Sequence, residues 1–122
     1  MRNLLSLAAL GAFVIALPAA AQDATAGAKT FGARCAMCHG KAGEGGGLAP
    51  SLKGVYRAKA ASNAWPRYTT ALKGSKITWT DDKLNAFLAG PKKVVPGTAM
   101  YMMLANPSDR ANVIAHLKTF KK

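Results

Sequence analysis

The sequence predicts an all-α domain with three to five short helices joined by long loops. Apolar residues recur at helical spacing in segments that open on capping residues and stop at glycine or proline. No clear strand and no internal repeat is present. Long loops in a small domain call for a functional reason, and enclosing a large, flat, apolar cofactor supplies one.

The first predicted helix spans residues 24–35. Asp23 or Thr25 can cap it, and Phe31 lies on its apolar face. A short helix over residues 68–73 is expected next, because Gly74 follows it. Residues 53–67, between these helices, are interpreted as irregular surface chain.

Two further helices follow in the second half. Thr80 is a good cap for a helix that ends at Gly90 and Pro91. Residues 92–100 are expected to form an extended loop, turned at Pro96-Gly97. Asn106 and Pro107 then begin the last helix. Its apolar stripe is formed by Val113, Ile114, Leu117 and Phe120.

Residues 1–21 are typical of a cleaved secretory signal peptide. Arg2 supplies a positive start, residues 4–17 form an apolar run, and residues 19–21 are alanines. The run is too short to span a membrane. We expect cleavage before Gln22, which leaves residues 22–122 as one exported, periplasmic domain. An uncleaved N-terminal anchor is the alternative.

The chain is strongly basic. Without Arg2, 16 of the 17 lysines and arginines oppose five acidic residues, a formal charge of +11. Such a charge suits nucleic acid, an anionic membrane surface or acidic protein partners. No nucleic-acid-binding motif is present, so acidic faces of partner proteins fit best, and a solvated surface without a dedicated partner is the alternative. We expect a monomer with no stable membrane insertion.

The segment Cys35-Ala36-Met37-Cys38-His39 carries the most specific chemistry. Two thiols at i and i+3 and an imidazole at i+4 lie on one face of a helical turn. This C-x-x-C-H spacing is typical of c-type haem attachment, in which each thiol forms a thioether with a haem vinyl group and the imidazole points at the iron.

Other interpretations of the motif fit less well. A redox dithiol would need a strand–helix–strand setting that the sequence lacks. A structural zinc site needs about four ligands, and His116 lies far from the motif. A disulfide between Cys35 and Cys38 would leave His39 without a role.

Two loops could complete such a site. Residues 40–47 are polar and rich in glycine, and the chain returns at Pro50, whose carbonyl can accept the second imidazole proton of His39. The loop that ends in Met100 is suited to bringing a thioether to the iron. Met102 and Met103 are alternatives, although they lack the preceding Pro-Gly-Thr.

Taken together, these motifs resemble the class I c-type cytochromes over almost all of the exported chain. The resemblance rests on the C-x-x-C-H motif near the N-terminus, followed much later by a Pro-Gly-Thr-x-Met loop. Further matching positions are Gly27, Phe31, Pro50, Leu52, Tyr68, Trp79, residues 90–100 and residues 113–117.

The resemblance implies a small cytochrome c fold wrapped around one covalent haem c. It implies thioethers from Cys35 and Cys38, and iron ligation by His39 and Met100. It further implies that Pro50 orients His39 and that Gly27 lets the first and last helices cross closely. The remaining implied roles are hydrogen bonds from Tyr68 and Trp79 to a haem propionate, and support of the ligand loop by Thr98.

The chain departs from the family pattern at three positions. Phe87 stands where many members have a tyrosine, Leu72 where an asparagine is usual, and Ala58 where an arginine lies near the propionates. Arg57 or Lys59 could partly replace that arginine. Trp65 has no counterpart, and it could pack against either the haem periphery or the surface.

With both axial positions filled, the resemblance implies a single-electron carrier and not an enzyme. A shuttle between membrane complexes is expected, such as a bc1-type complex and an oxidase or photosynthetic reaction centre. A dedicated acceptor of one periplasmic dehydrogenase is the alternative. A haem enzyme or gas binder with an open iron would require that Met100 does not bind. A basic ring for docking is expected from Lys29, Lys41, Lys92 and Lys93.

Overall fold

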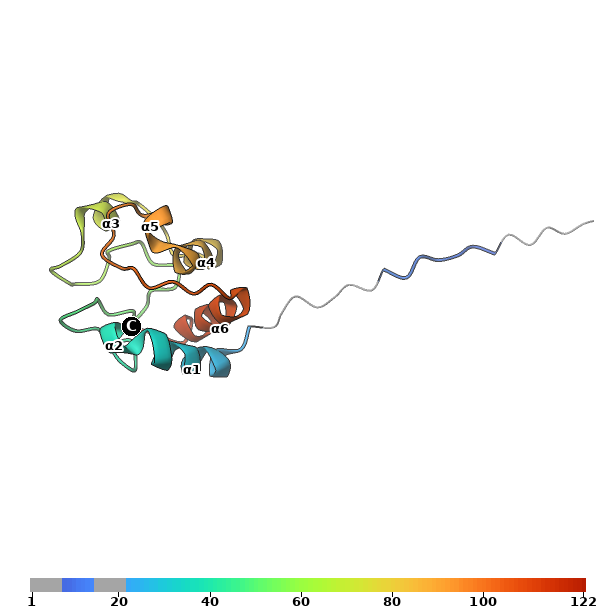
Figure 1. The fold of residues 1–122 in the computed structure, drawn as a ribbon, viewed down its shortest axis with the longest axis horizontal. Coiled ribbons are helices and arrows are strands. Elements are labelled where there is room, and N and C mark those ends of the chain that lie inside the picture. The colour runs from blue at the N-terminus through green and yellow to red at the C-terminus, as the bar shows by residue number, and fades with distance from the viewer. Residues whose placement is uncertain (1–7, 15–21) are drawn as a thin grey trace, which may run out of the picture.

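The computed structural model describes residues 8–14 and 22–122, and its folded part consists of short helices joined by long loops (Figure 1). In the described ranges, the only β-type pairing is an isolated bridge between Lys59 and Thr78. The predicted all-α class is therefore confirmed. The helices are α1 (Ala24–Arg34), α2 (Ala36–His39), α3 (Thr70–Gly74), α4 (Asp81–Ala89), α5 (Pro91–Val94) and α6 (Pro107–Leu117).

The helix starts follow their capping residues. The Asp23 carboxylate accepts hydrogen bonds from the first backbone N–H groups of α1, and Thr80 caps α4 in the same way. Asn106 caps α6, with Pro107 in its first turn. Of the two caps considered for α1, the structure selects Asp23.

One expected element differs. Residues 92–100 do not form a continuous extended loop, because α5 adds a helical turn directly after α4. Pro91 begins this turn, where its fixed φ suits a helix and its missing N–H costs nothing. The chain then turns at Pro96-Gly97, and Gly97 has a φ of 93° that favours glycine.

Helices α1 and α6 cross at backbone contact near the bottom of Figure 1. A Cβ atom on Gly27 would overlap the backbone carbonyl of Asn112. The Asn112 side chain also accepts a hydrogen bond from the Asp23 N–H over 3.0 Å. The close approach buries Phe31 and Val113, each only 1% exposed. The expected role of Gly27 is therefore confirmed.

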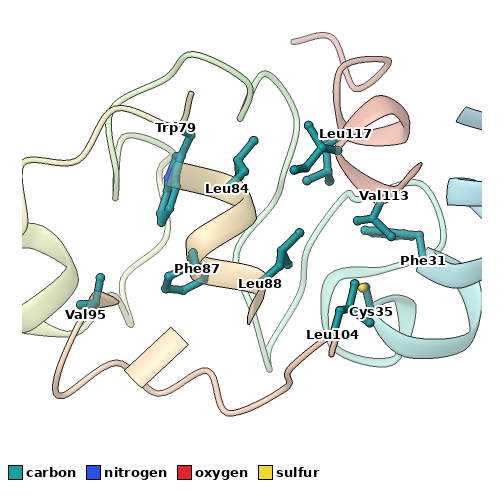
Figure 2. Close-up of a cluster of buried hydrophobic side chains, with 11 residues drawn as sticks. Phe31, Cys35, Trp79, Leu84, Phe87, Leu88, Val95, Leu104, Val113 and Leu117 are labelled. Atoms are coloured by element: carbon teal, nitrogen blue, oxygen red, sulfur yellow. The ribbon is translucent and has the colours of Figure 1, made fainter. Parts of the chain in front are cut away.

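The core is one cluster of buried side chains, and Figure 2 shows that α4 and its flanks contribute one part of it and α1 with α6 the other. Trp79 and Phe87 lie on the α4 side and meet edge to face, with ring centroids 4.9 Å apart. Phe31, Cys35 and Val113 lie on the side of α1 and α6. The two parts are the walls between which a cofactor could lie.

Trp79 is fixed by its backbone. Its N–H donates to the Ala58 carbonyl over 2.9 Å, and its own carbonyl accepts from the Arg57 N–H over 2.8 Å. The segment expected to be irregular, residues 53–67, thus pairs locally with residues 77–79. This pairing places the Trp79 ring in the core, where it is 7% exposed.

His116 packs among aromatic side chains and not against the predicted haem site. Its ring meets the edges of Phe31 and Phe120, with centroids 5.3 Å and 4.8 Å away. Burial against these rings lowers the pKa of its imidazole. His116 therefore packs the α1–α6 interface as a largely neutral side chain.

The expected signal peptide falls mostly outside the described residues, since 1–7 and 15–21 are not described. Residues 8–14 are exposed and belong to no helix. In the described ranges, none of the helices combines the length and the apolar character needed to cross a bilayer.

We predict that Gly27→Ala destabilises the protein and that Gly32→Ala does not. The new methyl group at residue 27 would force α1 and α6 apart, which we expect to lower the free energy of unfolding by about 1–3 kcal/mol. Gly32 lies on the same helix with open space around it. Its replacement should be neutral or stabilising by up to about 1 kcal/mol. Denaturant unfolding of both variants measures this, and equal stability would contradict the predicted crossing constraint.

Candidate cofactor site

A cavity of about 470 Å³ lies between the two parts of the core. Its lining is mainly apolar and comes from α1, α2, α3, α4, α6 and the loops between them. The structure brings all eight sequence-predicted site residues to this one cavity: Cys35, Cys38, His39, Pro50, Tyr68, Trp79, Thr98 and Met100. His116 is not part of the lining.

The two thiols lie on the short helix α2 and at its start. Cys35 is buried and Cys38 is exposed, and neither forms a disulfide. Burial raises the pKa of the Cys35 thiol to about 11, although the Arg34 charge beside it acts in the opposite direction. At neutral pH Cys35 is therefore a protonated, free thiol at the wall of the cavity.

His39 is oriented by the loop that follows it. Its Nδ1 lies 2.9 Å from the Pro50 carbonyl oxygen, a distance that fits donation from Nδ1–H. The proton on Nδ1 leaves the Nε2 lone pair for a metal, because a neutral imidazole carries only one N–H. Burial also lowers the pKa of His39, with the Pro50 carbonyl acting in the opposite direction. Both effects suit a neutral metal ligand.

The Met100 loop, residues 96–105, contributes residues 98–102 to the lining of the cavity. Thr98 is buried, and its hydroxyl accepts from the Met100 N–H over 3.4 Å. The Lys92 ammonium donates to the Thr98 carbonyl over 3.2 Å. These two hydrogen bonds fix the backbone at Thr98, two residues before Met100.

Trp65 and Arg67 support the glycine-rich loop from the other side. The Trp65 indole N–H donates to the Gly46 carbonyl over 3.0 Å, and Arg67 donates to the Gly47 carbonyl. Trp65 also meets the Tyr68 ring edge to face, and all three side chains line the cavity. The structure thus places Trp65 at the cavity periphery, which the sequence left undecided.

The three departures from the family pattern all lie on the cavity wall. Phe87, Leu72 and Ala58 each contribute apolar surface. Of the two cations considered as replacements for an arginine, Lys59 lines the cavity. Arg57 instead lies over the Tyr56 ring, 5.4 Å from its centroid.

The donor set fits a haem better than a metal cluster. In the described part of the chain, no three His, Cys, Asp or Glu side chains group as a metal site would require. The cavity instead offers two free thiols, one oriented imidazole and a thioether on an apolar wall. Two cysteines, a histidine and a methionine are the side chains with which proteins attach and ligate haem c.

Comparison with known proteins identifies the family. The family described as "Cytochrome c" matches residues 24–121. The chain belongs to the cytochrome c family. A cytochrome c from Arabidopsis thaliana is 45% identical over 98 residues, which cover 79% of this chain and 88% of that protein.

Bacterial cytochromes are also similar to this one. Cytochrome cH from Methylobacterium extorquens superimposes with a TM-score of 0.72 at 42% identity, and the match covers 80% of this chain and 98% of that one. The "Cytochrome c-type cyt cy" of Rhodobacter capsulatus is 39% identical over 82% of this chain and 50% of that protein. Cytochromes c carry covalent haem c and are electron carriers, not enzymes, with redox proteins as partners.

Sequence reasoning missed several residues that shape this cavity. Arg67 and Arg34 line it and donate to loop carbonyls and, for Arg34, to a sulfur atom, and the hydrogen bond from Trp65 to Gly46 was likewise not foreseen. No local sequence pattern predicts such contacts. An arginine that donates to a distant carbonyl looks the same in the sequence as an arginine that points into solvent. The only signal for these contacts in the sequence is the large number of Lys and Arg residues, which can donate to carbonyl groups.

Proposed function

We propose that this cytochrome is a periplasmic single-electron carrier that shuttles electrons between respiratory or photosynthetic complexes. The observation that carries the proposal is the presence of His39 and Met100 on one cavity, with both thiols of the C-x-x-C-H motif beside them. Two axial ligands leave no position for a substrate, so electron transfer is the chemistry that remains.

The proposed residue roles follow from the contacts. Cys35 and Cys38 would form the thioethers, and His39 and Met100 would be the axial ligands. Pro50 keeps the His39 ring in one orientation through the 2.9 Å contact to Nδ1. Haem c supplies one-electron chemistry when bound, and the apolar wall around it favours the less charged ferrous state.

Polar groups on the α3 and α4 side would receive the propionates. Burial raises the pKa of the Tyr68 hydroxyl, so it stays protonated and can donate a hydrogen bond. The Trp79 indole has only a donor to offer. Lys59 supplies a positive charge at the same cavity. We assign propionate binding to these three residues.

The proposed docking face is the cavity mouth, formed by the exposed lining residues Met37, Leu48 and Tyr101. These are 90%, 72% and 77% exposed, and exposed Met103 follows close to them in sequence. An exposed apolar patch of this kind is typical of an interaction site. Lys29, Lys41, Lys92 and Lys93 are exposed as well. We propose that they attract acidic partner surfaces.

Export is proposed from the N-terminal sequence together with the likeness to bacterial cytochromes. Residues 1–21 would be removed, and haem would be attached outside the cytoplasm. Cell fractionation followed by N-terminal sequencing tests this proposal. A mature chain that begins at Gln22 in the periplasmic fraction is expected, and a chain that retains Met1 would contradict it.

Met100→Leu should open the iron, whereas Met103→Leu should not. Leucine has no lone pair for the metal, so the ferric protein should lose the charge-transfer band at the red end of its visible spectrum. The ferrous variant should then bind carbon monoxide readily. Exposed Met103 is a matched control on the same loop. A Met100→Leu protein that keeps the band and excludes carbon monoxide would show that another residue ligates the iron.

Electron transfer to a membrane oxidase preparation should slow as salt rises. The Debye length falls from about 30 Å at 0.01 M to about 8 Å at 0.15 M ionic strength. We expect the second-order rate constant to fall about tenfold or more over that range. Lys29→Gln with Lys41→Gln should flatten the dependence, whereas Tyr101→Ser should lower the rate without changing the slope. A rate constant that does not change with ionic strength would contradict docking through these lysines.

A further inference from the structure

Arg34 links the haem-attachment segment to the Met100 loop. It is the last residue of α1, directly before Cys35, and its side chain crosses to a segment almost 70 positions away. The same nitrogen, Nη2, lies 3.2 Å from the Met102 sulfur and 3.2 Å from the Met103 carbonyl oxygen. Neither contact has a part in the function proposed above.

The loop presents two thioethers to the same cavity. Met100 and Met102 both line it and are only partly exposed, whereas Tyr101 and Met103 are largely exposed. This alternation is expected of extended chain, in which residues i and i+2 share a face. The loop therefore offers two sulfur atoms to the cavity that His39 also lines, and a further contact is needed to select between them.

We propose that Arg34 is a positioning residue that reserves the axial position for Met100 by holding the Met102 sulfur away from it. The inference rests on the proposed ligation by Met100. A guanidinium that donates to a thioether engages one of the two sulfur lone pairs and fixes the direction in which the sulfur points. Its positive charge also makes that sulfur a poorer donor to a metal cation.

The bond to the Met103 carbonyl adds a backbone constraint. This bond holds the backbone next to Met102, so a movement of the loop that carried Met102 toward the position of Met100 would have to break it. The flanks of the loop are held independently. Lys92 donates to the Thr98 carbonyl over 3.2 Å, and Arg110 donates to the Leu104 and Ala105 carbonyls over 2.8 and 2.9 Å.

Arginine suits this task better than lysine. Its planar head presents several N–H donors in fixed directions, so one side chain can serve a sulfur and a carbonyl together. Arg34 is exposed to solvent, so each contact is weaker than a buried bond would be. Selection between two nearby sulfurs nevertheless needs only a small difference in free energy.

The test compares carbon monoxide affinities of ferrous haem-loaded variants. In Met100→Leu, Arg34 still holds Met102, so the iron should be open. In Met100→Leu/Arg34→Gln, Met102 is released and can bind, so the carbon monoxide affinity should fall by about tenfold or more, the scale of a charge-assisted hydrogen bond. Adding Met102→Leu to that double variant should restore the high affinity.

This result separates positioning from general loosening. A loop that was merely destabilised would leave the iron more accessible, not less, so the expected change has the opposite sign. Met100→Leu/Lys83→Gln is the matched control, because Lys83 carries the same charge, is exposed on α4 and does not line the cavity. Methionine methyl resonances of the ferrous double variant should identify Met102 as the ligand.

Three outcomes have distinct meanings. Equal carbon monoxide affinity in Met100→Leu and Met100→Leu/Arg34→Gln would overturn the role of Arg34. Failure of Met100→Leu alone to bind carbon monoxide, with ready binding by Met100→Leu/Met102→Leu, would also overturn the role of Arg34, because Met102 would then ligate in spite of it. Failure of both variants to bind carbon monoxide would instead overturn the proposed ligation by Met100, together with the inference built on it.

Discussion

The crossing of α1 and α6 is the constraint on which the rest of the molecule depends. Gly27 allows backbone contact with Asn112, and that contact buries Phe31 beneath Val113. The end of α1 is thereby fixed against the core, and Cys35 follows it directly. One absent methyl group on the first helix thus determines where the first haem-attaching thiol can lie.

The basic side chains have a structural role as well as an electrostatic one. Irregular loops leave carbonyl groups without partners, and these must be satisfied if the loops are to hold one shape. At least four of the 17 cationic side chains donate to such carbonyls, so they hold the loops in shape besides adding positive charge to the surface. They are Arg34, Arg67, Lys92 and Arg110.

The fold was predictable where local chemistry decides it. Short local patterns predicted the helix caps at Thr80 and Asn106. The C-x-x-C-H motif that ends at His39 is likewise recognisable within five residues. The α5 turn was missed because Lys92 and Lys93 have no apolar periodicity, and a single Pro91 decides it. The contact of Trp65 with Gly46 spans 19 residues and uses a backbone acceptor that no sequence pattern marks. The roles assigned at the cavity still rest on the proposals above.

The chain ends and the Met100 loop differ in how they are held. The crossing of α1 and α6 is tightly packed and in backbone contact, whereas residues 98–105 combine buried Thr98 and Leu104 with partly or fully exposed cations that donate to carbonyl oxygens. Exposed polar contacts open at a lower free energy than a packed interface. The termini of most domains fray first. Here the terminal helices α1 and α6 should therefore be the last to open, with faster hydrogen exchange in residues 98–105.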